Sequence, residues 1–358
     1  MGTTTPFSGP AAAYGGTTKA LNAYFESLNV QGGINGRKLT VVALDDGYSP
    51  PKALEHTRRL VEREQVAFIV MPIGTPTCMA TRKYLNENGV PQLFIGSGAS
   101  VWDDEAATYP WSVGWQPVFA DEGRAIAKHI LKTLPAAKVA VFTQNDDAGR
   151  DLFRGLEAEF KAAGKPLAAQ ATHEVTDPTV DSQIVRLMGT GADVLVMWGS
   201  PKATLQTLRK AGDLAWRPQI YINQNSSSVP SVMAPAGPDR SKGVISGAFI
   251  KDAADPAWAK DPGVRAWSEL MDKFNPGMPK DYFAAYGTSI AQTTAQVLRQ
   301  CAADLTRENV MRQARRLHLE LPMLLPGIAV DTNASERHPV RGLRMQQFDG
   351  SSWKVLPV

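Results

Sequence analysis

The sequence has little of what marks a disulfide scaffold, a metal site or a membrane span. Its two cysteines, Cys78 and Cys301, lie far apart and form neither a CxxC motif nor a metal-ligand spacing. We therefore expect two buried free thiols, with a long-range disulfide as the alternative. No apolar run reaches the ~18 residues that a membrane helix needs, so we expect no membrane segment in this chain.

An excess of charge of one sign is also missing. The formal net charge of the 358 residues is +3, and no run of lysine or arginine forms a basic stripe. Nucleic acid is therefore not an expected partner. The hydrophobic fraction of 43% and the charged fraction of 20% are those of an ordinary globular protein, and the length favours two domains.

Catalytic and nucleotide-binding signatures are absent. The chain contains no GxSxG elbow, no GxxxxGK[ST] loop, no GxGxxG after a predicted strand and no HExxH. Asp45-Asp46 and Asp146-Asp147 could hold a cation or act in acid–base chemistry. Both pairs fall where a strand ends in a turn, however, which favours local hydrogen bonding. We expect no enzyme, and hence no catalytic residue, metal or cofactor.

The chain does contain a strand–loop–helix alternation that occurs twice. Short connections between these elements predict two parallel sheets with helices on their faces. Segment 108–117 interrupts the alternation and suggests a crossing between domains. The first series has strands at 2–5, 39–44, 67–71 and 92–95. The second has strands at 138–143, 194–198, 219–222 and 243–250, and is followed by helices at 263–274, 281–304 and 307–317 and a β-like tail.

Loops rich in Ser, Thr, Gly and Asn follow these strands and precede helices. Small residues let backbone N–H groups approach a ligand, and hydroxyl groups at helix starts hydrogen-bond an anion. A cleft between two such sheet edges would bind a ligand without reacting it, and domain closure would bury the ligand. The loops are 6–15, 74–77, 96–100, 145–149, 199–201 and 223–228.

At these loops the sequence resembles the type I periplasmic solute-binding proteins of ABC transporters, in the branch of the leucine/isoleucine/valine-binding protein. The motifs that carry the resemblance are Ser8-Gly-Pro-Ala-Ala-Ala-Tyr-Gly15, Gly32-Gly-Ile-Asn-Gly-Arg-Lys38, Asp45-Asp46, Gly96-Ser-Gly-Ala-Ser100 and Asp281-Tyr-Phe-Ala-Ala-Tyr-Gly287. The resemblance covers essentially the whole chain. It implies an α/β fold of two Rossmann-like lobes joined by three hinge crossings. The lobes would be residues 1–117 with 247–325, and residues 118–246 with 326–358.

The resemblance also implies a periplasmic location, membrane permease subunits as partners and a small carboxylate as ligand. We expect a monomer. No signal peptide begins the sequence, and the chain starts inside its first predicted strand. We therefore expect that a leader and the start of that strand are absent from this chain.

In the family's amino-acid binders, two first-lobe loops hold the ligand's carboxylate. The matching positions are Gly74 and Thr75 in one loop and Gly98 to Ser100 in the other. In the second lobe, two family aromatics fall at Ala148 and at Ser200 or Pro201. The acid that receives the ligand's ammonium falls at Asn225. The predicted ligand-binding residues are Phe7, Tyr14, Gly74, Thr75, Thr77, Gly98, Ser100, Asp147, Ala148, Ser200 and Asn225.

Asn225 leads to a hypothesis about the ligand, because a buried ammonium needs a charge partner or strong hydrogen bonds. Asp147 could replace the missing acid if it points inward. Otherwise the ligand is an aromatic or short organic acid rather than an α-amino acid. Loss of the aromatics at Ala148 and Ser200 enlarges the pocket, and Phe7 and Tyr14 could form one wall.

The sequence is also compatible with other functions and with other roles for several of these residues. The function could be branched-chain amino acid binding, or ligand sensing by an effector protein of the same fold. Tyr14 could be a packing residue at a helix start, and Thr75 and Thr77 could be helix N-caps. Ser226 to Ser228 could be a solvated loop. Tryptophans such as Trp198 are more often packing residues than ligand contacts.

Overall fold

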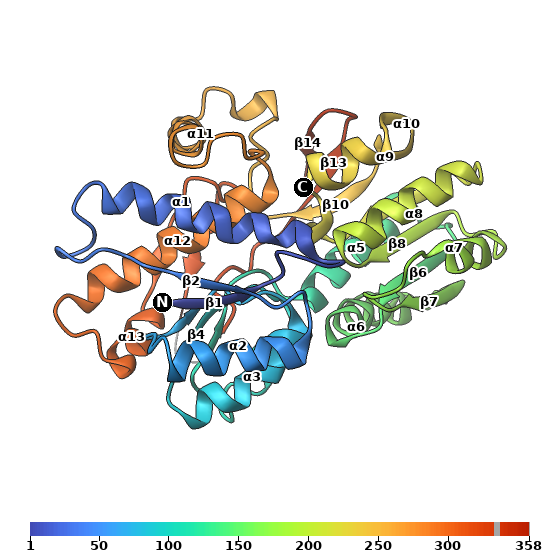
Figure 1. Ribbon diagram of the computed structural model, residues 1–358. Helices are drawn as coiled ribbons and strands as arrows, with labels where there is room; N and C mark the ends of the chain where they lie inside the picture. The colour runs from blue at the N-terminus through green and yellow to red at the C-terminus, as the bar shows by residue number, and fades with distance from the viewer. Residues whose placement is uncertain (333–336, 358) are drawn as a thin grey trace. The chain divides into compact units, whose positions relative to one another are not determined.

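The computed structural model describes residues 1–332 and 337–357. The chain folds into two compact units, and Figure 1 labels their helices and strands. Unit 1 comprises Met1–Pro117 and Trp258–Gly342, and unit 2 comprises Val118–Ala257 and Leu343–Val358. The chain thus passes from one unit to the other at 117/118, 257/258 and 342/343.

Unit 1 contains a parallel sheet in the order β2-β1-β3-β4-β5. Its strands are β1 (Gly2–Thr5), β2 (Val42–Asp45), β3 (Ile69–Val70), β4 (Gln92–Ile95) and β5 (Ser112–Gly114). Its helices are η1 (Ala12–Tyr14), α1 (Gly15–Asn29), α2 (Pro50–Glu62), α3 (Thr75–Glu87), α4 (Val101–Asp104), α11 (Pro262–Phe274), α12 (Tyr282–Cys301) and α13 (Arg307–Ala314). The short helix η4 (Pro256–Trp258) contains the unit boundary at 257/258, and β11 (His318–Leu319) pairs antiparallel with β12 (Val330–Asp331).

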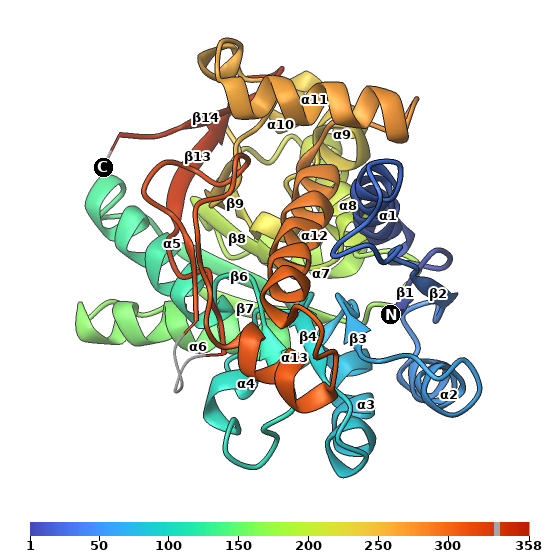
Figure 2. The same ribbon diagram turned by 90° about the vertical axis from the view of Figure 1, so that its left-hand side faces the viewer.

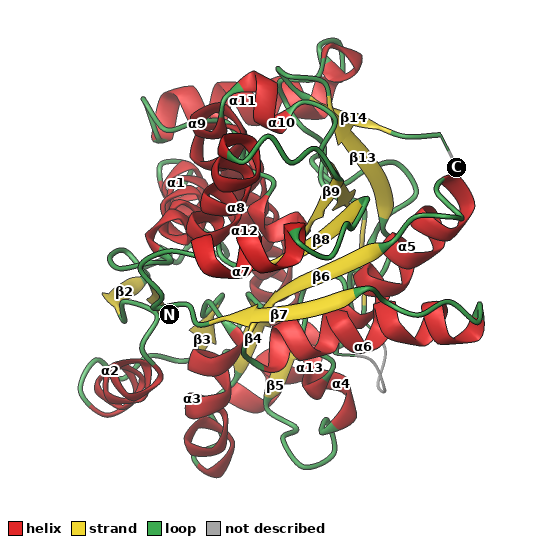
Figure 3. Cartoon of the chain, turned by 90° about the vertical axis from the view of Figure 1, so that its right-hand side faces the viewer, coloured by secondary structure: helices red, strands yellow, loops and turns green. Residues whose placement is uncertain are grey.

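Unit 2 contains a sheet in the order β14-β13-β10-β9-β8-β6-β7, in which β13 pairs antiparallel with both β10 and β14. Figure 3 labels the strands of this sheet other than β10. Its strands are β6 (Val139–Gln144), β7 (Ala169–His173), β8 (Val194–Trp198), β9 (Gln219–Ile222), β10 (Ile245–Ala248), β13 (Arg344–Phe348) and β14 (Trp353–Val355). Its helices are α5 (Phe119–Thr133), α6 (Asp147–Ala162), α7 (Asp181–Met188), α8 (Pro201–Asp213), η2 (Gln224–Ser226), η3 (Val229–Met233), α9 (Ala234–Ala236) and α10 (Pro238–Ser241).

The parallel part of each sheet has the same topology. Strand order reverses at β1/β3 in unit 1 and at β6/β8 in unit 2. Ligands of open α/β sheets bind outside the carboxyl ends of the strands at such a switch point. The loops that follow these four strands are therefore the first places to look for binding residues.

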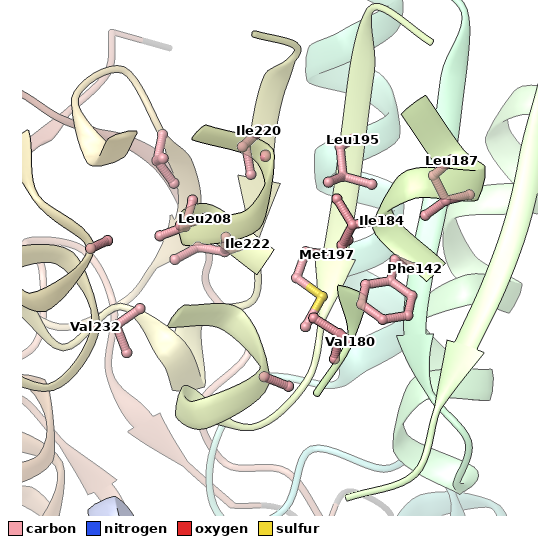
Figure 4. Packing of buried hydrophobic residues seen from close by; sticks show 14 of the residues in the cluster. Phe142, Val180, Ile184, Leu187, Leu195, Met197, Leu208, Ile220, Ile222 and Val232 are labelled. Atoms are coloured by element: carbon pink, nitrogen blue, oxygen red, sulfur yellow. The ribbon is translucent and has the colours of Figure 1, made fainter. Parts of the chain in front are cut away.

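The core of unit 2 explains why its strands could be predicted. β8 is buried along its whole length, as expected for a strand with helices on both faces. Figure 4 shows Leu195 and Met197 of β8 packed near Ile184 of α7, with Phe142 of β6 in the same cluster. An uninterrupted apolar run is the sequence signature of such a strand.

In unit 1, α12 packs along α1, and the two helices lie side by side in Figures 1 and 2. Gly287 makes this approach possible, because a Cβ there would lie 2.0 Å from the carbonyl oxygen of Thr17. Gly287 closes the Asp281–Gly287 motif. That motif therefore has a packing role in the pairing of α1 with α12.

Several elements were not identified from the sequence, among them β5, α4, β7 and α7. The edge strand β7 alternates buried and exposed positions over only five residues. The helix α7 buries two of its eight residues, Ile184 and Leu187. Both periodic signals are too short to separate an element from a loop.

The unit boundaries differ from the expected lobes. Residues 247–257 group with unit 2, because β10 is hydrogen-bonded to β9 and β13. Residues 326–342 group with unit 1. There the ring nitrogens of the buried His338 hydrogen-bond the carbonyls of Gln116 (2.8 Å) and Ala99 (3.1 Å).

Candidate ligand-binding residues

Asp45 holds the loop after β1 in place. Its Oδ1 accepts hydrogen bonds from the backbone N–H groups of Phe7 (2.9 Å), Ser8 (3.2 Å) and Gly47 (3.0 Å), and its Oδ2 accepts one from Ser8 Oγ (2.6 Å). Burial acts to raise the pKa of Asp45. The hydrogen bonds from Ser8, Gly47 and Phe7 lower it by more, so the pKa lies below its ordinary value. Phe7 is 37% exposed. Asp45 thus has the structural role that its turn position favoured.

Tyr14 lies at the end of this loop and is half-buried. Its ring packs edge-on against Phe283 at 5.7 Å and lies 6.4 Å from the ring of Tyr48. Tyr48 is a residue that the sequence did not single out. It is 9% exposed and has a φ of +64°, a strained conformation for an aromatic residue. The sequence feature that could have identified Tyr48 is its position directly after the Asp45-Asp46-Gly47 turn.

Gly74 is the N-cap of α3 and lies against the ring of Tyr48. Its φ is +101°, and a Cβ at this position would lie 2.5 Å from Cε2 of Tyr48 and 2.8 Å from Oγ1 of Thr77. The Gly74 N–H donates to the carbonyl of Gly96 at 3.2 Å, which ties the loop after β3 to the loop after β4. Only glycine satisfies both the backbone conformation and the close approach.

Thr75, the first residue of α3, is joined to Ser97 by a hydrogen bond of 2.7 Å between their hydroxyl oxygens. Ser97 Oγ also accepts from the Ala99 N–H (3.2 Å) and from Trp102 Nε1 (3.1 Å). A hydroxyl oxygen accepts two hydrogen bonds and donates one. Ser97 therefore donates to Thr75, and the Thr75 proton is left to donate elsewhere.

Neither Thr75 nor Thr77 is an N-cap, so the N-cap alternative for these two residues is wrong. Gly74 occupies the N-cap position of α3, and no side chain caps the helix. Thr77 Oγ1 donates to the carbonyls of Ile73 and Gly74, so its proton is used inside unit 1.

Gly98 is buried in the loop after β4. Ser100 is the N-cap of α4, and its carbonyl accepts from the N–H groups of Asp103 and Asp104, each at 2.9 Å.

In unit 2, the loop after β6 begins α6. Asp146 is its N-cap, with Oδ1 accepting from the Gly149 N–H at 2.9 Å and Oδ2 from Gln144 Nε2 at 2.6 Å. Asp147 is exposed and pairs with Arg150 at 2.7 Å on the same helix. The inward orientation that an ammonium partner would need is therefore not observed for Asp147. Ala148 beside it is buried.

The loops after β8 and β9 are joined by hydrogen bonds. Asn223 Oδ1 accepts from the Gly199 N–H at 3.2 Å, and Ser226 Oγ donates to the Gly199 carbonyl at 2.8 Å. Ser200 Oγ accepts from the Ala203 N–H at 3.3 Å as the N-cap of α8. Asn225 lies half-buried in η2.

The solvated-loop alternative for Ser226 to Ser228 is wrong. The three serines are 0%, 3% and 0% exposed. Ser227 Oγ donates to the Gln224 carbonyl at 2.7 Å, and Ser228 Oγ accepts from the Ser231 N–H at 3.2 Å. The small polar side chains of this buried segment hydrogen-bond its backbone groups. Composition alone does not distinguish such a segment from a solvated loop.

Buried polar groups that the sequence did not reveal gather at this edge of unit 2. Within the described residues, Trp198 Nε1, Asn223 Nδ2, both amide atoms of Gln224 and Oε2 of Glu122 have no hydrogen-bond partner. Glu122 Oε1 accepts from the Gln224 N–H at 2.7 Å. Burial raises the pKa of Glu122 to about 8, although the bond from Gln224 opposes the shift. At neutral pH Glu122 is therefore mostly protonated.

Metal-binding groups and membrane-spanning helices are absent from the residues that the structure describes. No described group of three or more His, Cys, Asp or Glu side chains could hold a metal ion. None of the described helices has the length and apolar character needed to cross a membrane. Cys78 and Cys301 are both buried and free, so the long-range disulfide alternative is wrong.

Comparisons with known proteins agree with the fold of the two units. The periplasmic binding protein family matches residues 1–352. Among curated relatives, the Leu/Ile/Val-binding protein homolog 7 of Brucella suis biovar 1 (strain 1330) is 24% identical over 229 residues. That match covers 62% of this chain and 57% of the relative, so the chain spans little more than half the relative's length.

Solved structures resemble the chain over nearly its full length. A substrate-binding periplasmic protein from Ralstonia solanacearum has a TM-score of 0.89 at 20% identity, covering 99% of both chains. A solute-binding protein of an ABC transporter from R. palustris, solved with benzoate, has a TM-score of 0.86 at 21% identity and covers 99% of this chain and 94% of its own. The expectation of an α/β type I fold with two parallel-sheet lobes is confirmed. The chain belongs to the periplasmic binding protein family, whose members bind solutes and are not enzymes.

Proposed function

We propose that this chain is the extracytoplasmic solute-binding component of an ABC importer of the branched-chain amino acid family. Its solute is a small carboxylate, with an aromatic or short organic acid favoured over an α-amino acid. The location is the periplasm, the partners are membrane permease subunits, and the protein acts as a monomer. The resemblance to transporter components of known structure supports the transport role.

The observation that carries the carboxylate assignment is the direction of the Thr75–Ser97 hydrogen bond. The Thr75 hydroxyl is left with a proton to donate at the first residue of α3. The N-terminus of a helix also carries partial positive charge and backbone N–H groups without intrahelical partners. A hydroxyl donor at such a terminus suits an anion. Gly74, Gly98 and Ser100 lie in the same two loops, and Phe7 and Tyr14 would contact the remainder of the solute.

The preference against an α-amino acid rests on unit 2. Asn225 is neutral, and Asp147, the other candidate for an ammonium partner, is exposed and paired with Arg150. A buried ammonium without a charged partner is costly. Ala148 and Ser200 would line the site with small side chains, leaving space for a ring. The benzoate complex of the R. palustris protein is consistent with this preference.

Calorimetry tests the solute class. The protein is unfolded, freed of bound small molecules, refolded, and titrated with benzoate and with leucine. We expect benzoate to bind and leucine to bind much more weakly. The variant Asn225→Glu supplies the missing acid, so it should strengthen leucine binding and weaken benzoate binding. Tight leucine binding by the unchanged protein, with no response to benzoate, would overturn the preference.

Branched-chain amino acid binding is the second candidate. It is favoured by the names of the curated relatives, which are Leu/Ile/Val-binding protein homologs. The same titration decides between the two candidates. If leucine binds tightly to the unchanged protein, Glu122→Gln identifies whether the buried Glu122 carboxyl serves the ammonium.

A further inference from the structure

The ring of His338 lies between two backbone carbonyl groups of unit 1. Its Nδ1 is 2.8 Å from the carbonyl oxygen of Gln116, and its Nε2 is 3.1 Å from the carbonyl oxygen of Ala99. The residue is 0% exposed. The ring also packs against β5, since a Cβ on Gly114 would lie 3.0 Å from both Cε1 and Nδ1 of His338. The ring therefore has a fixed orientation in which each nitrogen faces an acceptor.

These two acceptors determine the protonation of the ring. A carbonyl oxygen has no proton to donate, so a ring nitrogen that hydrogen-bonds it must carry one. A neutral imidazole carries a single proton, and its other nitrogen would turn a lone pair toward a carbonyl oxygen. Only the imidazolium, with a proton on both nitrogens, satisfies both contacts.

The two hydrogen bonds also lower the cost of burying this charge. They use both donors of the imidazolium, and a charged donor strengthens each bond. The segments that contact the ring, residues 96–100 and 112–116, contain no ionisable side chain. The charged groups beside the ring are Arg337 and Arg341 of its own segment and Asp103 of α4. Asp103 accepts from the Arg337 N–H at 2.6 Å and pairs with Arg341 at 2.9 Å, which brings a negative charge to the histidine segment.

We propose that His338 is a positioning residue for the loop after β4, and that it acts as a doubly protonated imidazolium. This inference rests on the proposed function, since the solute's carboxylate is assigned to that loop and to the start of α3. A peptide group is planar and trans, so its C=O and its N–H point in opposite directions. By binding the Ala99 carbonyl, His338 fixes the direction of the Ser100 N–H.

Ala99 also connects His338 to the Thr75 hydroxyl. The Ala99 carbonyl accepts from the Trp102 N–H at 3.3 Å, and the Ala99 N–H donates to Ser97 Oγ at 3.2 Å. Ser97 in turn donates to Thr75. His338 thus holds in place the residue whose N–H helps to orient the Thr75 hydroxyl.

Loss of one proton from His338 should release this loop. The neutral ring keeps a single donor, and the bond to Ala99 is the longer and therefore the weaker of the two. A nitrogen lone pair would then face the Ala99 carbonyl oxygen and repel it. The peptide between Ala99 and Ser100 would lose its fixed orientation, so solute affinity should fall.

NMR of the full chain labelled with nitrogen-15 in its histidines tests the protonation state. We expect a proton on both ring nitrogens of His338 at pH 7, in signals that are absent from His338→Gln. A single ring proton at pH 7 would overturn the imidazolium assignment. If His338→Gln does not fold, replacing the other histidines one at a time assigns the His338 signals by elimination. These are His56, His129, His173 and His318.

Calorimetry with benzoate from pH 7 to pH 9 tests the positioning role. Benzoate stays ionised throughout, as carboxyl groups do well above their ordinary pKa. His338→Gln should bind benzoate roughly threefold to tenfold more weakly at pH 7, the effect of losing one hydrogen bond. The unchanged protein should lose affinity only over the pH interval in which NMR shows His338 losing a proton, and His338→Gln should show no such loss. Glu122, whose pKa burial raises to about 8, titrates equally in both proteins.

His318→Gln is the matched control. His318 belongs to the same unit and lies 3.1 Å from Asp331, but it is exposed and far from the ring of His338 in sequence. This variant should keep the benzoate affinity of the unchanged protein and its pH profile. Thermal unfolding shows whether each variant folds.

The outcomes separate this inference from the proposed function. If no carboxylate binds at any pH, the proposed function fails, and NMR still decides whether His338 is an imidazolium. If benzoate binds and His338 carries a single ring proton at pH 7, the inference is wrong and the carboxylate function stands. If His338→Gln binds benzoate as tightly as the unchanged protein, or has the same pH profile, His338 does not position the loop.

Discussion

The hydroxyl of Ser97 donates its hydrogen bond to Thr75 across 2.7 Å, because the Ala99 N–H and Trp102 Nε1 occupy its two acceptor positions. The hydrogen bond between these two buried hydroxyls therefore has a single direction. Thr75 becomes a donor that is oriented before any solute arrives, and preorganised groups bind more tightly than groups that must first be ordered.

Thr75→Val should weaken benzoate binding by roughly tenfold to a hundredfold, the effect of losing a hydrogen bond to a charged group, about 1.5–3 kcal/mol. Thr75→Ser keeps the hydroxyl and should keep most of the affinity. Calorimetry measures both. Thr77→Val is the control, because Thr77 donates to the carbonyls of Ile73 and Gly74. It should lower stability by about 1 kcal/mol and leave affinity unchanged. A large affinity loss in Thr77→Val would show that Thr77 contacts the solute.

Gly74→Ala should destabilise the protein by several kcal/mol. The new Cβ would lie 2.5 Å from Cε2 of Tyr48, and the φ of +101° is itself unfavourable for alanine. Gly36→Ala is matched for positive φ (+74°) but has no atom within 4 Å of the new Cβ. It should cost only about 1–2 kcal/mol. Urea unfolding compares the two variants, and equal losses would mean that backbone conformation alone, without the contact with Tyr48, determines the effect.

Asp45→Ala should loosen the loop after β1. Three backbone N–H groups and the Ser8 hydroxyl lose their acceptor, so amide exchange at Phe7 and Ser8 should accelerate and benzoate affinity should fall. The pKa of Asp45 is lowered in the folded protein. The stabilisation that it contributes is therefore present above its unfolded pKa and is lost as pH falls through the folded pKa.

Asp349→Ala is the control for this change. Asp349 also accepts from backbone N–H groups, those of Ser351 and Ser352 at 2.8 Å, but in unit 2. It should perturb the β13–β14 turn without altering exchange at Phe7. Unchanged exchange in Asp45→Ala would show that other contacts hold the first loop.

Glu122→Gln should remove a pH dependence of stability. Burial raises the pKa of Glu122 to about 8, so the folded state holds its proton more tightly than the unfolded state. The stability that this proton contributes is fully present below the unfolded pKa, ~4.3, and is lost as pH rises toward about 8. Glu122→Gln keeps an acceptor for the Gln224 N–H. It should therefore raise the melting temperature at pH 9 relative to the unchanged protein and have little effect at pH 5. An equal effect at both pH values would mean that Glu122 ionises normally.

Much of the fold followed from local pattern. The uninterrupted run Val194–Trp198 predicted β8, and β4 and β9 begin and end at the predicted residues. The helix α7 and the edge strand β7 were missed, because eight and five residues are too short for a periodic pattern to separate an element from a loop. The unit assignment of residues 326–342 could not be inferred, since it depends on His338 contacting carbonyls more than 200 positions earlier in the chain.

By itself the sequence determined the alternation of strands and helices, the small-residue loops at the strand ends and the family. These depend on side-chain periodicity and on residues that permit particular backbone conformations, and both are local. The tertiary structure decided what each polar group does. Thr75 and Thr77 are two residues apart and chemically identical, yet one is bonded to Ser97 and the other to carbonyls of its own turn. Hydrogen-bond direction depends on partners distant in sequence, and only the folded chain brings them together.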